Sequence, residues 1–545
     1  METFSNESEN PCLVETRQGF SVLYRKHFLY SKYNPSQSVK KIIEQTEIKK
    51  NTLVLVFSPL LFYGFNELLE KLPEDSFIFA IETDSRLFDF SKEYYYPFSN
   101  NKNCCYCNVT SIYEFSKLLE SSRIPPAGNF RHVLSIDFSA GVQLNKIQYE
   151  SFKQTADNFI STFWKNRMTL TRMGRLYAKN IFTNLKYLSS SENLVPFSIT
   201  RPLLVLGAGL SVENLLPLLA DEADRFYIIA VDAVSKTLLK SGIIPDSIVM
   251  VESQLANEKS FIGIAGSKIP VITDLTSRPN IVNLTQGKKS FFLSEYTKCN
   301  FLDRLKKSSL INLCLPPLGS VGLAAIEIAL YLRSEKIPVY FCGLDFCYDA
   351  GKTHCKEAPA HRTNLDTHNR LNTIEKVFSA FRQHSFYHIG KDNKYHITDP
   401  ALSTYAQLFS ARYSMIENLW DIGNTGINLG SRFCTIEQMI ENAKNYSEKT
   451  SSQLKEKSHN NNQTNLYAKK FLKEELDSLV KIKNILTGKI KDEKSELESL
   501  LNEREYLFLH FPDAYSGLKM NESFLKRIRA ELDIFIKTIE ISLKY

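Results

Sequence analysis

Short apolar runs alternate with helix-length segments through the first 440 residues of the chain, which is the pattern of an α/β protein. Near the start, residues 52–57, 77–82 and 133–138 each form such a run, and the amphipathic stretch FNELLEKL separates the first two. Strands separated by helices in this way are typical of a small doubly wound unit. We therefore predict a smaller α/β domain over residues 1–145.

A second and longer series of apolar runs begins near Pro202, after a segment, residues 146–195, that we expect to be a helical connection. Its predicted strands are at 227–232, 246–252, 269–274, 288–293 and 337–345. Strands joined by helix-length crossovers pair in parallel and are covered on both faces of the sheet. The sequence thus predicts a Rossmann-like, doubly wound parallel sheet in a central domain over residues 146–440.

The pattern changes after residue 441, where we expect an α-helical C-terminal domain that extends to residue 545. Residues 442–465 are polar and predict a flexible connection. Beyond it, apolar residues recur at three- and four-residue steps among Lys and Glu: Leu472, Leu476, Leu479, Leu486, Ile490, Leu497 and Leu500. This leucine stripe either packs on neighbouring helices or forms a surface for a second copy of the chain or for a protein substrate.

The composition is that of an ordinary globular protein, with 43% hydrophobic and 23% charged residues among 545. Because the formal net charge of +7 is small for this length and forms no basic stripe, nucleic acid is not an expected partner. The longest apolar run, residues 53–65, is too short to cross a bilayer, and the N-terminus lacks the pattern of a secretory signal. We expect a cytoplasmic protein without a membrane partner.

Cysteine and histidine cluster at two places where a metal site has to be considered. The stretch CCYC at residues 104–107 is not followed by a second ligand pair at zinc spacing. Six of the ten histidines lie between residues 354 and 396, and the HxxxH pair in HSFYH lacks the glutamate of zinc proteases. We therefore expect no metal, and we expect one histidine to act as a general base.

The turn GAGLS follows the apolar run LLVL and is the main candidate for ligand binding. Gly207 and Gly209 permit a tight turn close to an anion, and Ser211 begins a helix whose unpaired N–H groups would face a phosphate. Asp232 closes the next predicted strand, where a nicotinamide-binding fold has its ribose carboxylate. Since Val212 replaces the third glycine of G-x-G-x-x-G, the turn predicts either a nucleotide phosphate site or only a structural turn.

Further polar residues follow the later predicted strands or begin the helices after them, at the sheet edge where open α/β folds bind ligands. They are Glu252, Gln254, Gly319, Ser320, Asp345 and His354. Gly319 and Ser320 would open a second helix whose N-terminus can bind an anion.

These motifs, in this order and spacing, resemble the motility-associated-factor (Maf) glycosyltransferases, within the wider family of proteins like archaeal 6-hydroxymethylpterin pyrophosphokinase. The resemblance covers about residues 201–434 and rests on GAGLS, GIIPD at 242–246, GSVG at 319–322 and GLD at 343–345. The same features are similar to bacterial sialyltransferases that use CMP-activated nonulosonic acids. Two departures are Leu210, where the family commonly has proline, and SPLLFYGF, which replaces a glycine-rich turn in the N-terminal domain.

The resemblance implies an inverting, sialyltransferase-like enzyme that transfers a pseudaminic or legionaminic acid type of sugar from CMP to Ser or Thr of flagellin. It implies no cofactor beyond this donor, makes His354 the base, and assigns the substrate-binding positions to Gly207, Gly209, Ser211, Asp232, Glu252, Gln254, Gly319, Ser320 and Asp345. The C-terminal helices could recognise flagellin or mediate self-association. Two rivals are a pterin pyrophosphokinase with Mg²⁺ on Asp232 and Glu252, and a non-catalytic flagellin-binding scaffold.

Overall fold

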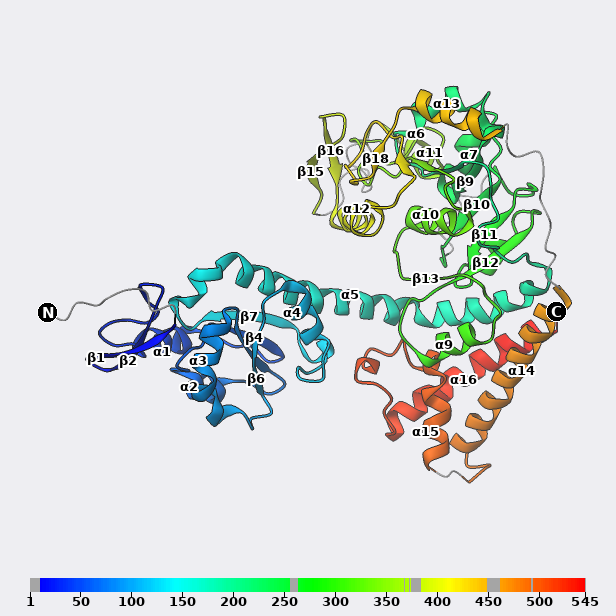
Figure 1. The fold of residues 1–545 in the computed structure, drawn as a ribbon. Coiled ribbons are helices and arrows are strands. Elements are labelled where there is room, and N and C mark those ends of the chain that lie inside the picture. Colours follow the sequence, from blue (N-terminus) through cyan, green and yellow to red (C-terminus); the bar gives the residue numbers. More distant parts are fainter. Residues whose placement is uncertain are drawn as a thin grey trace. The chain divides into compact units, whose positions relative to one another are not determined.

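The computed structural model of the chain describes residues 10–254, 263–366, 368–371, 373, 384–447, 461–491 and 494–544. Two compact units are present. The first takes the chain up to Arg172 together with Phe511–Gly517, and the second takes Met173–His510 and the chain from Leu518 on. Helix α5 (Lys146–Asn184) begins in the first unit and ends in the second (Figure 1). Among the described residues, no helix has both the length and the apolar character that crossing a bilayer requires.

The first unit is built on a four-stranded parallel sheet with the order β6-β5-β4-β7, preceded by a three-stranded antiparallel sheet, β1-β2-β3. Every residue of β4 and β5 is buried, as in the central strands of a covered parallel sheet. The predicted α/β architecture of this part of the chain is therefore confirmed, and the CCYC stretch lies in the edge strand β6. The elements are β1 (Cys12–Thr16), β2 (Gly19–Tyr24), β3 (His27–Phe28), α1 (Gln37–Gln45), β4 (Thr52–Phe57), α2 (Phe65–Lys71), β5 (Phe77–Glu82), α3 (Ser85–Tyr95), β6 (Cys104–Asn108), α4 (Ile112–Leu119) and β7 (His132–Asp137).

The turn after β4 is filled by its own apolar side chains, because residues 60–62 are buried there. The Ser58 hydroxyl donates a hydrogen bond of 2.7 Å to the buried carboxylate of Glu82 at the end of β5. The Tyr149 hydroxyl and the Thr83 amide also donate to this carboxylate, at 3.0 Å and 2.8 Å. Protein groups therefore surround Glu82 at the sheet edge, in agreement with a structural role for this part of the chain.

The second unit contains a nine-stranded sheet with the order β13-β12-β11-β10-β9-β8-β14-β17-β18, in which every pair of neighbours is parallel. An antiparallel hairpin, β15-β16, stands apart from it. The predicted Rossmann-like sheet is thus confirmed. Its strands and the helices between them are β8 (Leu203–Leu206), α6 (Val212–Leu219), β9 (Tyr227–Val231), α7 (Asp232–Lys240), β10 (Ser247–Met250), β11 (Val271–Asp274), α8 (Pro279–Val282), β12 (Lys289–Ser294), α9 (Asn300–Lys307), β13 (Cys314–Leu315), α10 (Val321–Leu332), β14 (Val339–Cys342), α11 (Pro359–Asp366), β15 (Phe386–Ile389), β16 (Tyr395–Thr398), α12 (Pro400–Tyr413), β17 (Leu419–Asp421), β18 (Arg432–Phe433) and α13 (Ile436–Ser447).

Three strands of this sheet end earlier than the sequence pattern predicts, and one of them is β10, which ends at Met250 rather than at Glu252. β9 ends at Val231, so that Asp232 is the first residue of α7 rather than the last residue of the strand. β14 ends at Cys342, and Gly343, with a φ of +76°, turns the chain so that Asp345 lies beyond the strand. At the ends of β9 and β14, apolar residues continue beyond the last residue that pairs with a neighbouring strand. Hydrophobicity alone therefore overestimates the length of these strands.

The C-terminal part consists of α14 (Asn461–Leu486), α15 (Lys494–Asn502) and α16 (Glu522–Leu543), which confirms the predicted helical character. α14 lies against α16, and of the leucine stripe Leu472, Leu479 and Leu497 are buried while Ile490 is exposed. Three of the seven stripe residues are therefore buried in packing within this unit, and Leu476, Leu486 and Leu500 are half-buried. Self-association through the C-terminal helices stays a prediction.

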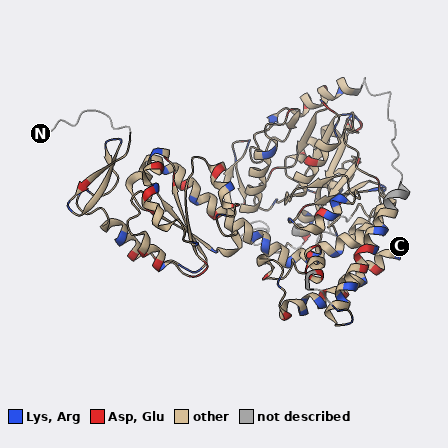
Figure 2. Ribbon diagram, turned by 60° about the horizontal axis from the view of Figure 1, so that its bottom comes forward, with Lys and Arg blue, Asp and Glu red and all other residues tan. Residues whose placement is uncertain are grey.

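The predicted flexible connection at residues 442–465 is wrong at both ends. Residues 442–447 continue α13 because Met439 and Ala443 are buried in the core of the second unit, and residues 461–465 already belong to α14. The intervening residues 448–460 lie outside the described part of the chain. Basic and acidic residues are interspersed along the helices (Figure 2), as expected without a basic stripe.

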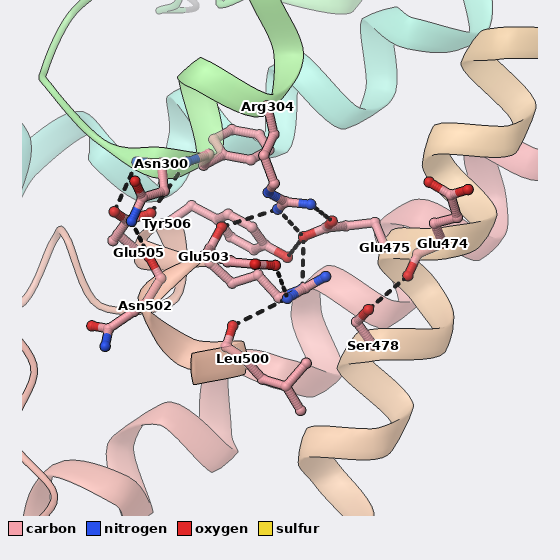
Figure 3. A network of polar contacts seen from close by, with 12 residues as sticks. Asn300, Arg304, Glu474, Glu475, Ser478, Leu500, Asn502, Glu503, Glu505 and Tyr506 are labelled. Atoms are coloured by element: carbon pink, nitrogen blue, oxygen red, sulfur yellow. Dashed lines mark hydrogen bonds and ion pairs between the residues drawn. The ribbon is translucent and has the colours of Figure 1, made fainter. Parts of the chain in front are cut away.

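A buried ion network joins the C-terminal helices to α9 (Figure 3). Glu475 of α14, which is fully buried, accepts hydrogen bonds from Arg304 of α9 at 2.8 Å and 3.1 Å and from the Tyr506 hydroxyl at 2.7 Å. The guanidinium of Arg504 lies 3.2 Å from the same carboxylate. Glu505 in addition accepts from the amides of Asn300 and Phe301 at the first turn of α9 (2.8 Å and 3.2 Å). These contacts attach the C-terminal helices to the sheet unit.

Candidate functional site

The candidate site lies at the point where the winding of the nine-stranded sheet reverses. β8, the first strand of the series, has β9 on one side and β14 on the other, so the chain first winds away from β8 and later returns to its opposite side. Open α/β folds bind ligands at the carboxyl ends of the strands where the winding reverses, which here is the edge formed by the ends of β8 and β14.

The turns that follow β8 and β14 touch backbone to backbone. The Gly207 amide donates to the Cys342 carbonyl and the Gly209 amide donates to the Gly343 carbonyl, both at 2.8 Å. A Cβ atom on Gly207 would lie 2.2 Å from the Gly343 carbonyl oxygen, so a side chain at this position cannot be accommodated without moving one of the turns. The glycine of the motif is therefore required first of all for contact between the two turns.

Ser211 and Asp345 hold the same two turns together. The Ser211 amide and hydroxyl donate to the Asp345 carboxylate at 2.9 Å and 2.5 Å, and the Gly343 amide donates to the Ser211 hydroxyl oxygen at 2.9 Å. Both side chains are buried, and burial raises the pKa of Asp345 although the hydrogen bonds from Ser211 oppose the rise. Ser211 occupies the N-cap position of α6, but its hydroxyl does not cap the helix.

These bonds correct one expectation from the sequence. The glycines were expected to bring the turn close to an anion, and the amides at the start of the helix were expected to be unpaired and to face a phosphate. The amides of Gly207, Gly209 and Ser211 instead all donate to groups of β14 and the turn after it. The physical reason is that a glycine turn can approach another backbone as closely as it can approach an anion, and sequence does not distinguish the two. Binding of a ligand by these residues stays a prediction.

Gly207→Ala should disrupt the site, because the added methyl group collides with the Gly343 carbonyl oxygen. We expect a loss of about 2–4 kcal/mol in stability of the second unit, the range found for strongly overpacked or strained positions. Urea denaturation followed by the fluorescence of Trp420 in β17 measures it. Gly174→Ala in α5 is the matched control, since its Cβ would meet only ordinary contacts at 3.5 Å or more. Equal stability of the two variants would contradict the prediction.

A cavity of about 200 Å³ opens above the two turns. It contains five of the predicted site residues, and its apolar wall comes from Val231, Leu344, Phe346 and Leu402. The residues that line it are Gly207, Ala208, Gly209, Val231, Ala233, Ser320, Val321, Gly322, Gly343, Leu344, Asp345, Phe346, Cys347, Tyr348, Thr353, His354 and Leu402. Sequence motifs identified the glycines, Ser320, Asp345 and His354, but they gave no signal for Tyr348 or Leu402.

The N-terminus of α10 is the strongest anion-binding feature of this cavity. Ser320 is its N-cap residue, and Val321 and Gly322 also line the cavity. Within the described part of the chain, no acceptor takes the amide hydrogens of Val321, Gly322 or Leu323. These donors and the positive end of a twelve-residue helix favour a phosphate group here. Gly319, with a φ of +71°, packs against the ring of Tyr405 and does not line the cavity.

His354 lies on the loop after β14 and lines the same cavity. It is half-buried, and its Nδ1 atom is 3.0 Å from the hydroxyl of Thr353. In the tautomer whose Nδ1 donates to the Thr353 hydroxyl, the lone pair that can accept a proton is on Nε2. The position fits the general base that the sequence predicts.

Three other predicted residues, Asp232, Glu252 and Gln254, do not line the cavity. Asp232 stands between two lining residues, and burial, aided by the nearby charge of Glu252, raises the pKa of its carboxyl to about 7. Glu252 accepts a hydrogen bond from the Gln254 amide at 2.9 Å, and neither residue lines the cavity. The structure thus brings Asp232 and Glu252 together. The segment 255–262, which follows them, lies outside the described residues.

Three other histidines of the segment 354–396 lie in or next to the β15-β16 hairpin. His396 of β16 is buried, with Nδ1 at 2.7 Å from Asp349 and Nε2 at 2.9 Å from Asp392. His388 lies on β15 opposite His396, and His384 precedes this strand. Among the described residues, no three His, Cys, Asp or Glu side chains are arranged to hold a metal ion.

Stability of the hairpin unit should fall as the pH rises, because of His396. Burial, the largest effect, lowers the pKa of His396, but the hydrogen bonds and charges of Asp392 and Asp349 outweigh it and raise the pKa above its ordinary value. The stabilisation that protonated His396 gains from the two carboxylates is fully present below about pH 6.5, the ordinary pKa of histidine. It is lost as the pH rises through the raised pKa of His396 in the folded protein. We expect His396→Gln to remove this dependence in urea denaturation between about pH 5.5 and about pH 8.5. His27→Gln, at an exposed position on β3, should keep it.

Known proteins resemble this chain in sequence. Residues 176–351 match the family described as 6-hydroxymethylpterin diphosphokinase MptE-like, a range that includes both turns, α10 and Asp345. An uncharacterized protein of Treponema pallidum (strain Nichols) is 30% identical over 551 residues, which covers 97% of this chain and 95% of the relative.

The chain belongs to the MptE-like family. This MptE-like protein is similar in fold to the Maf glycosyltransferase from Magnetospirillum magneticum AMB-1, with a TM-score of 0.54 and 13% sequence identity. The superposition covers 99% of this chain and 92% of the other. At this identity the likeness establishes the fold, including the N-terminal and C-terminal parts beside the sheet. The similarity to sialyltransferases stays a prediction.

Proposed function

We propose that this MptE-like protein is a cytoplasmic protein O-glycosyltransferase that transfers a nonulosonic acid from its CMP-activated donor to Ser or Thr of flagellin. The observation that carries the proposal is the cavity at the reversal point of the sheet, where the open N-terminus of α10 and the imidazole of His354 line one space. The Maf-like fold supports it, because the whole length of the chain follows the architecture of a glycosyltransferase.

The arrangement supplies the two functions that such a transfer requires. The phosphate of the leaving CMP would be bound by the amides of α10, which stabilise the negative charge as the bond to the sugar breaks. His354 Nε2 would take the proton of the acceptor hydroxyl as that oxygen attacks the sugar carbon. The apolar side chains of the cavity exclude water that would otherwise compete with the acceptor.

The intact mass of flagellin from cells with and without the gene tests this proposal. We expect the flagellin of cells that carry the gene to be heavier by whole multiples of one nonulosonic acid residue. An unchanged mass would remove flagellin as the acceptor. Restoration of the mass by the wild-type gene is the control, and the size of the step identifies the sugar class.

A second candidate is a pterin pyrophosphokinase, which the family match and the proximity of Asp232 to Glu252 favour. Two neighbouring carboxylates are the ligands that Mg²⁺ prefers when it binds nucleotide phosphates. Chelation distinguishes the two candidates. Complete loss of activity in chelator, with recovery on addition of Mg²⁺, would favour the pyrophosphokinase, whereas the proposed transferase should retain its activity.

A further inference from the structure

Lys391 lies in the loop that joins β15 and β16 and forms an ion pair with Asp421 at the end of β17. Its ammonium group donates to the Asp421 carboxylate at 2.6 Å, and its side chain is 17% exposed while that of Asp421 is 6% exposed. The backbone of the same residue is fixed by a hydrogen bond of 2.9 Å from its amide to the Gly426 carbonyl. No motif in the sequence indicated this residue, since it lies in a short loop far along the chain from the glycine turn.

The ammonium group of Lys391 is close to the groups that hold the two turns. Both groups border Gly423. A Cβ atom added to Gly423 would lie 3.0 Å from the Ser211 hydroxyl oxygen and 3.3 Å from the Lys391 ammonium nitrogen. The charge of Lys391 acts on Asp345 and favours its ionised form, while the charge of Asp421 acts in the opposite direction. The ammonium group of Lys391 therefore offsets the negative charge of two buried carboxylates, Asp421 and Asp345. Of these two, Asp345 lines the cavity.

An anionic ligand in this cavity faces a carboxylate, which costs binding energy unless a cation offsets it. We propose that Lys391 is a positioning residue for the donor, which compensates Asp345 and Asp421 beneath the cavity and thereby allows a phosphate group to bind above them. The inference rests on the proposed function, because it takes the phosphate-bearing ligand to be the CMP group of the donor. Lys391 acts through Asp345 and Ser211 and does not line the cavity itself.

The test compares CMP with uncharged cytidine as probes in calorimetric titrations of the full chain. We expect Lys391→Met to weaken CMP binding about tenfold, because the phosphate loses the partly screened attraction of one positive charge. Binding of uncharged cytidine should be unchanged. Lys394→Met is the matched control, because it removes the same charge from an exposed position in the same loop. The double variant Lys391→Met with Asp421→Asn should regain most of the CMP affinity, since it removes one positive and one negative charge together.

Equal losses for CMP and cytidine, or no loss for either, would overturn the role of Lys391. A wild-type protein that binds inorganic pyrophosphate but not CMP would overturn the proposed donor instead, and the same variants titrated with pyrophosphate would then decide the role of Lys391. Amide hydrogen exchange adds a readout that needs no ligand: Lys391→Met should speed exchange at the Ser211 amide, which donates to Asp345. Unchanged exchange there would contradict positioning of the turn.

Discussion

Glu475→Gln should destabilise the attachment of the C-terminal helices by about 3–5 kcal/mol, because it leaves the buried Arg504 and the half-buried Arg304 without their carboxylate. Arg304 and Arg504 contact this one side chain from α9 and from the segment after α15, and the Tyr506 hydroxyl donates to it as well (Figure 3). Glutamine keeps the volume of glutamate, so the loss reports the charge and its hydrogen bonds rather than a cavity. Amide hydrogen exchange in α14 measures the effect as a loss of protection of about 10²- to 10⁴-fold.

Glu474→Gln is the control for this experiment. Glu474 precedes Glu475 in α14 and is exposed. Its carboxylate forms a long ion pair of 3.8 Å with Lys470, one helical turn earlier. Exposed pairs of this kind contribute about 0.3–0.5 kcal/mol, so the control should be close to the wild-type protein. If Glu475→Gln and Glu474→Gln behaved alike, the buried network would not hold the C-terminal helices in place.

His354→Gln should lower the transfer of sugar to flagellin by about 10²- to 10⁴-fold, the usual contribution of a general base. The side chain lines the cavity, and glutamine retains hydrogen-bonding capacity but cannot accept the proton. The measurement is the intact mass of flagellin in cells that carry the variant in place of the wild-type gene, together with the rate of transfer by the purified protein. The loss should be in kcat, since the base acts in the chemical step.

His368→Gln, at an exposed position, is the matched control and should leave the flagellin mass unchanged. Full modification by both His354→Ala and Ser211→Ala would contradict catalysis in this cavity and favour a flagellin-binding scaffold. A scaffold without catalytic activity would also account for two departures from the family pattern. These are Leu210 in the glycine turn and the apolar side chains that fill the turn after β4.

The fold could be predicted from sequence because its strands are short, strongly apolar and separated by helix-length segments. Residues 52–57 and 77–82 were predicted as strands and are β4 and β5 with the same bounds. Agreement was poorest where apolar residues extend past the last strand pairing, as at Asp232 and Asp345. The polar segment after α13 was predicted too long, because polarity does not show that Ala443 is anchored on the core.

For the candidate site, the sequence by itself determined which turns and helix starts carry glycine and serine, and that His354 follows a strand of the parallel sheet. These are local properties, since conformational freedom and capping depend on a few neighbouring residues. Only the tertiary structure decided how the donors are used. The amides of the Gly207–Ser211 turn bind the β14 turn, those of α10 are directed to the cavity, and Lys391 reaches two carboxylates on other loops. Such pairings depend on the order of the strands in the sheet, which brings together segments that are far apart in the chain.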